Sequence, residues 1–163
     1  MKVLQGDNEI ILAVVCCQHG DEVFGQKVFE YYQDRLQGIR LIFANEEAFN
    51  HEKRFIDDDL NRNFPGGVEG NHEQRLAAQI LPYIKDVRYI LDIHTTTSDI
   101  IMTPIICNES EDVKKILNLT SSSEVAYMVN GIADHSLIGQ VAAGVSLEFN
   151  RGYAETEAAI DEV

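Results

Sequence analysis

The sequence predicts an α/β protein built on a mixed, mostly parallel sheet with helices on both faces. Short apolar segments rich in β-branched residues alternate with longer segments whose apolar residues recur at helical spacing, a pattern typical of strands joined by crossover helices. The first apolar segment has no polar face, as expected for a strand covered on both sides. With 163 residues, the chain is long enough to form one domain around its own hydrophobic core.

The first elements form a strand, a helix and a second strand. Residues 10–17 are short, apolar and β-branched, which predicts a buried strand. A helix is expected over residues 22–36, because apolar residues recur there at helical spacing, and Gly38 is expected to end it. Residues 39–44 predict the next strand. These segments together form a βαβ unit.

A long polar stretch, residues 45–71, follows this unit and contains Pro65 and several glycines. Loops of this length are uncommon inside a compact domain and are more often functional than idle. A helix is then expected from residue 72, with an apolar stripe that Pro82 interrupts near its end. The remaining expected elements are strands at 87–93, 100–107, 125–129 and 145–149, a short helix at 112–119 and a weakly helical acidic tail at 154–163.

Composition excludes several classes of partner. The formal net charge is −14, and so negative a surface repels phosphate backbones and anionic membranes, so we expect neither nucleic acid nor a membrane as a partner. The cysteines number three, without C-x-x-C spacing, which predicts no disulfide framework and no cysteine zinc site. The N-terminus shows no secretory pattern, and no apolar run approaches the roughly 20 residues of a membrane span. We therefore expect a soluble, cytoplasmic protein.

Two segments carry residues that suit a metal site. His19 and Glu22 lie three residues apart in a predicted strand-to-helix turn, and His94 comes just past the strand that begins at residue 87. Ligands of α/β sheets bind beyond the carboxyl ends of the strands, so these groups are expected to converge. Two histidines and one glutamate form a known ligand set for catalytic zinc, with a fourth position open. Taken alone, His19 and Glu22 would also fit a hydrogen-bonded turn, because an H-x-x-E pattern recurs by chance in many chains. A hydrogen-bonded histidine at a strand end is, on its own, the commoner explanation for His94.

Alternation along the strand places Asp92 on the same side as His94, where its carboxylate can accept the second ring N–H of a ligating histidine. In the long loop, Arg54, Asn61 and Arg62 have the chemistry to clamp a carboxylate and to polarise a carbonyl; a solvated charged loop is the alternative. For the three aspartates at residues 57–59, we expect exposure to water or turn capping rather than chemistry.

Four ordered motifs resemble the zinc carboxypeptidase superfamily: His-Gly-Asp-Glu at 19–22, Asp-Leu-Asn-Arg-Asn-Phe-Pro-Gly at 59–66, Asp-Ile-His-Thr at 92–95 and Ser-Leu-Glu-Phe at 146–149. The first two motifs are similar in form to the succinylglutamate desuccinylase and aspartoacylase branch. The resemblance implies a zinc carboxypeptidase-like, three-layer α/β/α fold. It also implies one Zn²⁺ per chain, held by the three residues His19, Glu22 and His94.

By the same resemblance, Glu148 is the general base, while Arg54, Asn61 and Arg62 polarise the substrate carbonyl and grip its carboxylate. The implied activity is hydrolysis of the amide bond of an N-acyl amino acid, a small anionic substrate, by water that zinc activates and Glu148 deprotonates. A metallocarboxypeptidase acting on a peptide C-terminus is the nearest alternative. A metal-binding domain without catalysis is a third, but such a domain would need neither Glu148 nor Arg62.

The sequence departs from the family pattern in several places. Cys17 replaces a small residue, and Asp21 replaces the usual asparagine of the first motif. The family's members are commonly longer, with a C-terminal region that contributes a tyrosine. We therefore expect residues 1–163 to be a single zinc-hydrolase catalytic domain without that region. No arginine lies between Thr95 and Glu148, where aspartoacylases place a carboxylate-binding arginine. The acyl group and the amino acid of the substrate consequently stay open.

Overall fold

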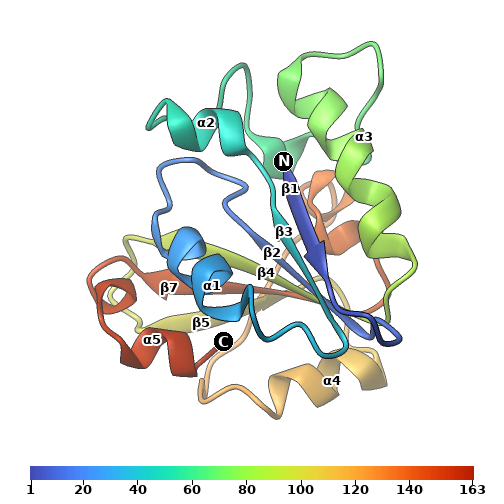
Figure 1. Cartoon of the computed structure of the whole chain (residues 1–163). Helices are drawn as coiled ribbons and strands as arrows, with labels where there is room; N and C mark the ends of the chain where they lie inside the picture. Colours follow the sequence, from blue (N-terminus) through green and yellow to red (C-terminus); the bar gives the residue numbers. More distant parts are fainter.

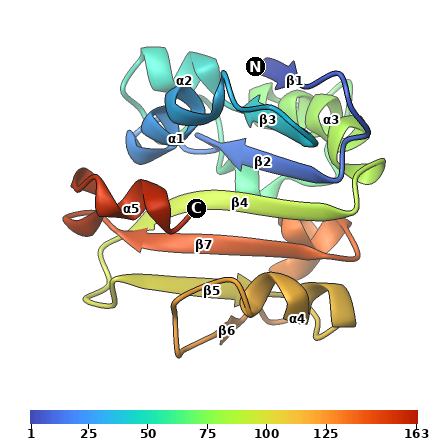
Figure 2. The same cartoon turned by 60° about the horizontal axis from the view of Figure 1, so that its bottom comes forward.

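The sheet of this protein has seven strands in the order β1-β3-β2-β4-β7-β5-β6, in a computed structural model that describes residues 1–163. The strands β3, β2, β4 and β7 are parallel, whereas β1 runs antiparallel to β3 and β5 runs antiparallel to β7 (Figure 2). Strand β6 is parallel to β5. The mixed, mostly parallel sheet is therefore confirmed. Its strands are β1 Lys2–Gln5, β2 Leu12–Cys16, β3 Ile39–Phe43, β4 Tyr89–Thr96, β5 Met102–Ile106, β6 Ala126–Tyr127 and β7 Gly144–Asn150.

Helices cover both faces of the sheet, which confirms the three-layer α/β/α arrangement (Figure 1). They are α1 Phe24–Tyr32, α2 Glu46–Asn50, α3 His72–Lys85, α4 Glu111–Leu117 and α5 Ala158–Asp161, with short 3₁₀ turns at Leu60–Arg62, Ala133–His135, Ile138–Gln140 and Tyr153–Glu155. None of these helices combines the length and apolar character needed to cross a membrane.

Two buried apolar clusters hold the three layers together. In β2, Val14 faces one cluster with α1, α4 and α5, whereas Ala13 and Val15 face the other with α3. This alternation follows from the two-residue repeat of a strand. Both faces of β2 are apolar because helices cover both, which is why its sequence lacks a polar face.

Several elements differ from the predicted ones. Strand β1 was not expected, because its residues are largely exposed at the edge of the sheet and lack a strong apolar pattern. Helix α2 lies inside the predicted loop, where the side chain of Asn45 accepts a hydrogen bond from the backbone N–H of Ala48 and caps the helix. Helix α3, in contrast, agrees with the predicted stripe: it accommodates Pro82 near its end and continues to Lys85, with Ile84 fully buried.

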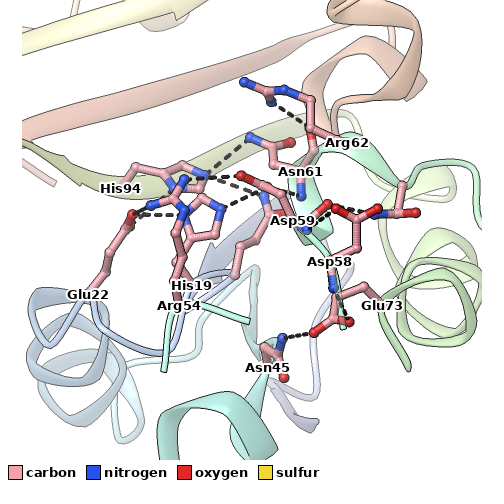
Figure 3. A network of polar contacts seen from close by, with 12 residues as sticks. His19, Glu22, Asn45, Arg54, Asp58, Asp59, Asn61, Arg62, Glu73 and His94 are labelled. Carbon is pink, nitrogen blue, oxygen red and sulfur yellow. Dashed lines mark hydrogen bonds and ion pairs between the residues drawn. The ribbon is translucent and has the colours of Figure 1, made fainter. Parts of the chain in front are cut away.

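The topology brings the ends of three strands to one edge of the sheet. Strands β2, β4 and β7 are neighbours and run parallel, so their carboxyl ends and the segments that follow them lie together (Figure 2). The long segment between β3 and α3 also returns to this edge, because its 3₁₀ turn packs near the end of β4 (Figure 3).

Candidate metal centre and active site

The turn after β2 positions the first two candidate ligands. Gly20 packs so closely on α2 that a Cβ atom there would lie 2.2 Å from the carbonyl carbon of Ala48, so only glycine fits. The backbone N–H of Gly20 also donates to the carbonyl of Arg54 over 3.1 Å. Within this turn, Nδ1 of His19 lies 2.7 Å from Oε1 of Glu22. The predicted pairing of the two side chains is therefore present.

Strand β4 brings the third candidate ligand to the same point. Nδ1 of His94 lies 3.1 Å from Oε2 of Glu22, and the potential ligand atoms of His19, Glu22 and His94 all lie within 4.8 Å of one another. Donor atoms on a tetrahedral zinc are separated by about 3.4 Å, given bonds of 2.0 to 2.1 Å. All three side chains are buried. The donor set and its spacing thus fit a zinc ion.

The electrostatics of the cluster also favour a cation. Burial alone would raise the pKa of Glu22, but the two histidines outweigh it and hold that pKa well below its usual range. Burial lowers the pKa of His94, but the charges of Asp92 and Glu22 outweigh it, so that pKa is raised overall. The raised pKa of His94 reflects the negative charge of the buried carboxylates around it. A divalent cation would supply the same positive charge more effectively.

An aspartate contacts the outer nitrogen of each histidine. Nε2 of His94 lies 3.0 Å from Oδ2 of Asp92, as the alternation of β4 predicted, and Gln18 donates its side-chain N–H to the same oxygen over 2.6 Å. Nε2 of His19 lies 3.0 Å from Oδ1 of Asp59. A carboxylate accepts the Nε2 proton in this arrangement and leaves the Nδ1 lone pair free for a metal.

The three aspartates at 57–59 were expected to face water or cap turns, and Asp59 does cap a turn but also contacts the candidate metal cluster. Asp57 does cap, because its Oδ2 accepts the backbone N–H of His72 at the start of α3. Asp58 accepts only the backbone N–H of its neighbour. Asp59 accepts the backbone N–H of Asn61 over 2.9 Å and so caps the 3₁₀ turn Leu60–Arg62. It also contacts His19 and accepts a hydrogen bond from Nη2 of Arg54 over 3.1 Å. Composition alone does not distinguish three successive aspartates, whereas the fold turns one of them inward.

Replacing Asp59 or Asp92 by alanine is expected to weaken metal affinity by about 10-fold to 100-fold, because each change frees one histidine ring to rotate. The measurement is a competition titration with a chelator of known affinity. Asp58→Ala is the matched control, since this neighbouring aspartate touches neither histidine. Affinities that match the control in both variants would remove these carboxylates from the metal site.

In the long loop Asn61 is buried, whereas Arg54 and Arg62 are exposed and extend in different directions (Figure 3). The guanidinium of Arg54 reaches toward the metal cluster, since Nη1 donates to Oε1 of Glu22 over 3.5 Å. Asn61 is buried, and its Oδ1 accepts the backbone N–H of Leu137 over 2.9 Å. Arg62 is exposed, and one N–H of its guanidinium donates a hydrogen bond to the backbone carbonyl of Asn61. The other N–H groups of the Arg62 guanidinium make no hydrogen bond within the chain, so they can bind a ligand.

Strand register places Glu148 beside His94. The two residues are paired in the parallel ladder of β4 and β7, so their side chains project from the same face of the sheet. Burial raises the pKa of Glu148, and the charge of His94 only partly offsets this effect. A carboxyl group with a raised pKa is suited to accepting and returning a proton near neutral pH.

One cavity of about 350 Å³ collects all the predicted site residues, a size typical of small-molecule sites. It is lined by His19, Glu22, Arg54, Asn61, Arg62, His94 and Glu148, and further by Thr95, Thr96, Thr97, Ile105, Met128 and Arg151. The three threonines follow His94 in the sequence and Arg151 follows Glu148 by three residues, so their closeness to predicted site residues could have indicated that they line the cavity. Ile105 and Met128 gave none, because only the sheet order brings β5 beside β7.

The mixed seven-stranded sheet, with the candidate ligands gathered at the carboxyl ends of β2 and β4, is the zinc carboxypeptidase-like fold. Within that class, residues 9–152 match the family model of the succinylglutamate desuccinylase/aspartoacylase catalytic domain. The chain therefore belongs to the succinylglutamate desuccinylase/aspartoacylase family, whose enzymes are hydrolases of the deacylase type.

The relatives agree with this assignment. A probable aspartoacylase from Trichodesmium erythraeum is 32% identical over 130 residues, which cover 69% of this chain and 44% of that protein. Among solved structures, the ectoine utilization protein EutE (DoeB) from Ruegeria pomeroyi superposes with a TM-score of 0.74 at 17% identity and covers 98% of this chain. Murine aminoacylase 3 gives a TM-score of 0.70 at 16% identity over 96% of this chain.

The chain is shorter than these relatives. It spans 55% of the Ruegeria structure and 61% of murine aminoacylase 3. The part that matches the family model, residues 9–152, contains strands β2 to β7 and every residue that lines the cavity. The family assignment therefore rests on the part of the fold that holds the candidate site.

Proposed function

We propose that this chain is a zinc-dependent hydrolase domain that cleaves the amide bond of N-acyl amino acids. The observation that carries the proposal is the composition of the single cavity described above. It combines a buried His-Glu-His set, a half-buried carboxylate beside it and three arginines, Arg54, Arg62 and Arg151, in a chain of net charge −14. Arginines concentrated against so negative an overall charge indicate an anionic ligand.

In this proposal, His19, Glu22 and His94 hold the zinc ion, with Asp59 and Asp92 orienting the histidines. A zinc ion in such a site makes water acidic enough to be deprotonated near neutral pH and polarises the carbonyl it contacts. Glu148 accepts the proton of the attacking water and returns it to the amine nitrogen as the amide bond breaks. The products are a carboxylate and a free amino acid.

The arginines divide between reaction and binding. Arg54 lies against the metal cluster through Glu22 and Asp59, which suits stabilisation of the negative charge that develops on the carbonyl oxygen. Asn61 and the exposed guanidinium of Arg62 are proposed to bind the substrate carboxylate, because arginine pairs with carboxylates in bidentate geometry. Buried, unpaired Cys16 and Cys17 suit a reducing compartment, so we propose that the protein acts in the cytoplasm.

Protein purified without chelators is expected to contain about one zinc ion per chain, since the three side chains leave one coordination position open. Elemental analysis measures this, and a screen of N-acetyl and N-succinyl amino acids against short peptides measures activity. Cleavage of acyl amino acids supports the proposal, whereas cleavage of peptides alone would indicate a metallocarboxypeptidase. Full zinc without either activity would indicate a metal-binding domain. Protein that takes up no transition metal even on soaking would contradict the zinc site itself.

A further inference from the structure

A buried carboxylate lies outside the cavity and is not used by the proposed reaction. Glu73, in the first turn of α3, is fully buried. Its Oε1 accepts the backbone N–H of Ile56 over 2.8 Å and the side-chain N–H of Asn45 over 3.1 Å. Its Oε2 accepts the backbone N–H groups of Asp57 and Asp58 over 3.0 and 3.1 Å (Figure 3). Both oxygens are therefore fully satisfied within the protein.

The donors show what this carboxylate does. Three successive backbone N–H groups, at residues 56–58, converge on it, so the loop backbone is folded around an anion as in the anion-binding nests of other proteins. Burying a charge is costly unless it is fully hydrogen-bonded, and here four donors meet that need. The N-terminal end of α3 adds a favourable dipole. The loop conformation and the ionised Glu73 side chain consequently depend on each other.

The same loop carries the groups that reach the metal cluster. Arg54 lies two residues before the segment 56–58 that surrounds Glu73. Asp59 follows this segment directly, and Asn61 comes two residues later. On its other side the loop is tied to the metal-binding turn by the hydrogen bond from Gly20 to the carbonyl of Arg54. Glu73 in α3 thus anchors a loop segment that contacts the candidate metal cluster on both sides. Before the segment, Arg54 contacts Glu22. After it, Asp59 contacts His19.

We infer that Glu73 is a positioning residue for the proposed reaction, holding Arg54 against the reacting carbonyl and Asp59 against His19. It contacts neither substrate nor metal, and its effect passes through the loop backbone. The inference rests on the proposed function for its effect on turnover. Its effects on metal affinity and on the loop backbone do not depend on that function.

Glu73→Gln tests the inference with little change in shape. The amide group replaces one acceptor oxygen by a donor, which then faces backbone N–H groups that can only donate. At saturating zinc, kcat is expected to fall by about 100-fold, the size of loss that a displacement of about 1 Å in a positioning group produces. Zinc affinity is expected to fall by about 10-fold through Asp59. Backbone amides 56–58 are expected to exchange with solvent faster by hydrogen-exchange mass spectrometry.

Asn71→Ala is the matched control, because Asn71 caps the same helix but its side chain makes no hydrogen bond to residues 54–61. Its side chain accepts the backbone N–H of Gln74, and the Gln74 side chain accepts the backbone N–H of Asn71. Both variants should lower the melting temperature. Only Glu73→Gln should lower kcat in folded, zinc-loaded protein. If the kcat of Glu73→Gln equals that of Asn71→Ala, Glu73 contributes to stability alone and the inference is overturned.

Two further measurements keep the test decisive. In an Arg54→Ala background, Glu73→Gln should lose most of its effect on kcat, whereas independent, multiplying effects would overturn the route through Arg54. If Glu73→Gln does not fold, Glu73→Asp retains the charge at shorter reach and should give a smaller loss of kcat and of zinc affinity. If the wild-type chain cleaves no acyl amino acid, the proposed function is wrong. The role of Glu73 in positioning the loop is then rejected only if Glu73→Gln also leaves zinc affinity and amide exchange unchanged.

Discussion

Replacing Glu148 by glutamine is expected to leave zinc bound while lowering kcat by about 10²-fold to 10⁴-fold, the range that general acid–base catalysis contributes. The amide keeps the shape of the side chain but does not take a proton from water. Glu148 lies beside His94 in the strand register and does not belong to the His-Glu-His set. Its loss should therefore remove proton transfer without removing a ligand. Steady-state kinetics and elemental analysis of the same preparation measure both effects.

Glu22→Gln is the natural comparison for this variant, because it makes the same chemical change at a proposed metal ligand. A neutral oxygen there replaces an anionic ligand, so zinc itself should be lost. If Glu148→Gln releases zinc at matched folding by circular dichroism, or retains full activity, the division of roles between the two glutamates is wrong.

The pH dependence gives a second readout of Glu148. A general base acts in its deprotonated form, so activity falls as the pH drops through its pKa. Burial raises the pKa of Glu148, which moves this acid limb to higher pH than for an ordinary glutamate, while the charge of a bound cation acts in the opposite direction. In Glu148→Gln, the residual activity should lose the part of the acid limb that belongs to this carboxyl group.

Replacing Arg54 by alanine is expected to lower kcat by about 10²-fold to 10³-fold, as for the loss of one donor to a developing oxyanion. The interaction strengthens as charge builds on the carbonyl oxygen, so turnover should suffer more than binding. Zinc content has to be measured in parallel, because Arg54 also donates to Glu22 and Asp59.

Arg62→Ala is the control for Arg54, since its exposed guanidinium is proposed to bind a carboxylate equally in the ground state and the transition state. It should raise KM and leave kcat nearly unchanged. The opposite pattern, with kcat falling for Arg62 and only KM rising for Arg54, would exchange the two proposed roles.

Much of the fold and of the candidate site was predictable because the informative residues are local. His19 and His94 each follow a strongly apolar strand, and the rule for strand ends in α/β sheets is enough to bring them together. Asp92 followed from alternation along β4. Strand β1 and helix α2 were not predictable, because an exposed edge strand and a five-residue helix carry too little apolar pattern to stand out.

The residues that escaped prediction are those whose surroundings come from distant parts of the chain. Glu73, at the start of a helix, has the pattern of an ordinary exposed residue favoured by the helix dipole, and only the folded loop buries it. Asp59 differs from its two neighbours solely in the direction its side chain takes. Ile105 enters the cavity because β5 pairs with β7, although α4 and β6 separate these two strands in the chain.

The ladder between β4 and β7 has a consequence for how this site can diversify. Neighbouring strands are held about 4.8 Å apart by backbone hydrogen bonds, so the spacing of His94 and Glu148 is set by main-chain geometry that substitutions of side chains do not alter. Ile105 and Met128 also line the cavity, and their side chains belong to none of the proposed metal-binding or catalytic groups. If the proposed roles hold, substitutions at these lining residues can change substrate preference while the backbone ladder keeps the proposed reactive groups in place.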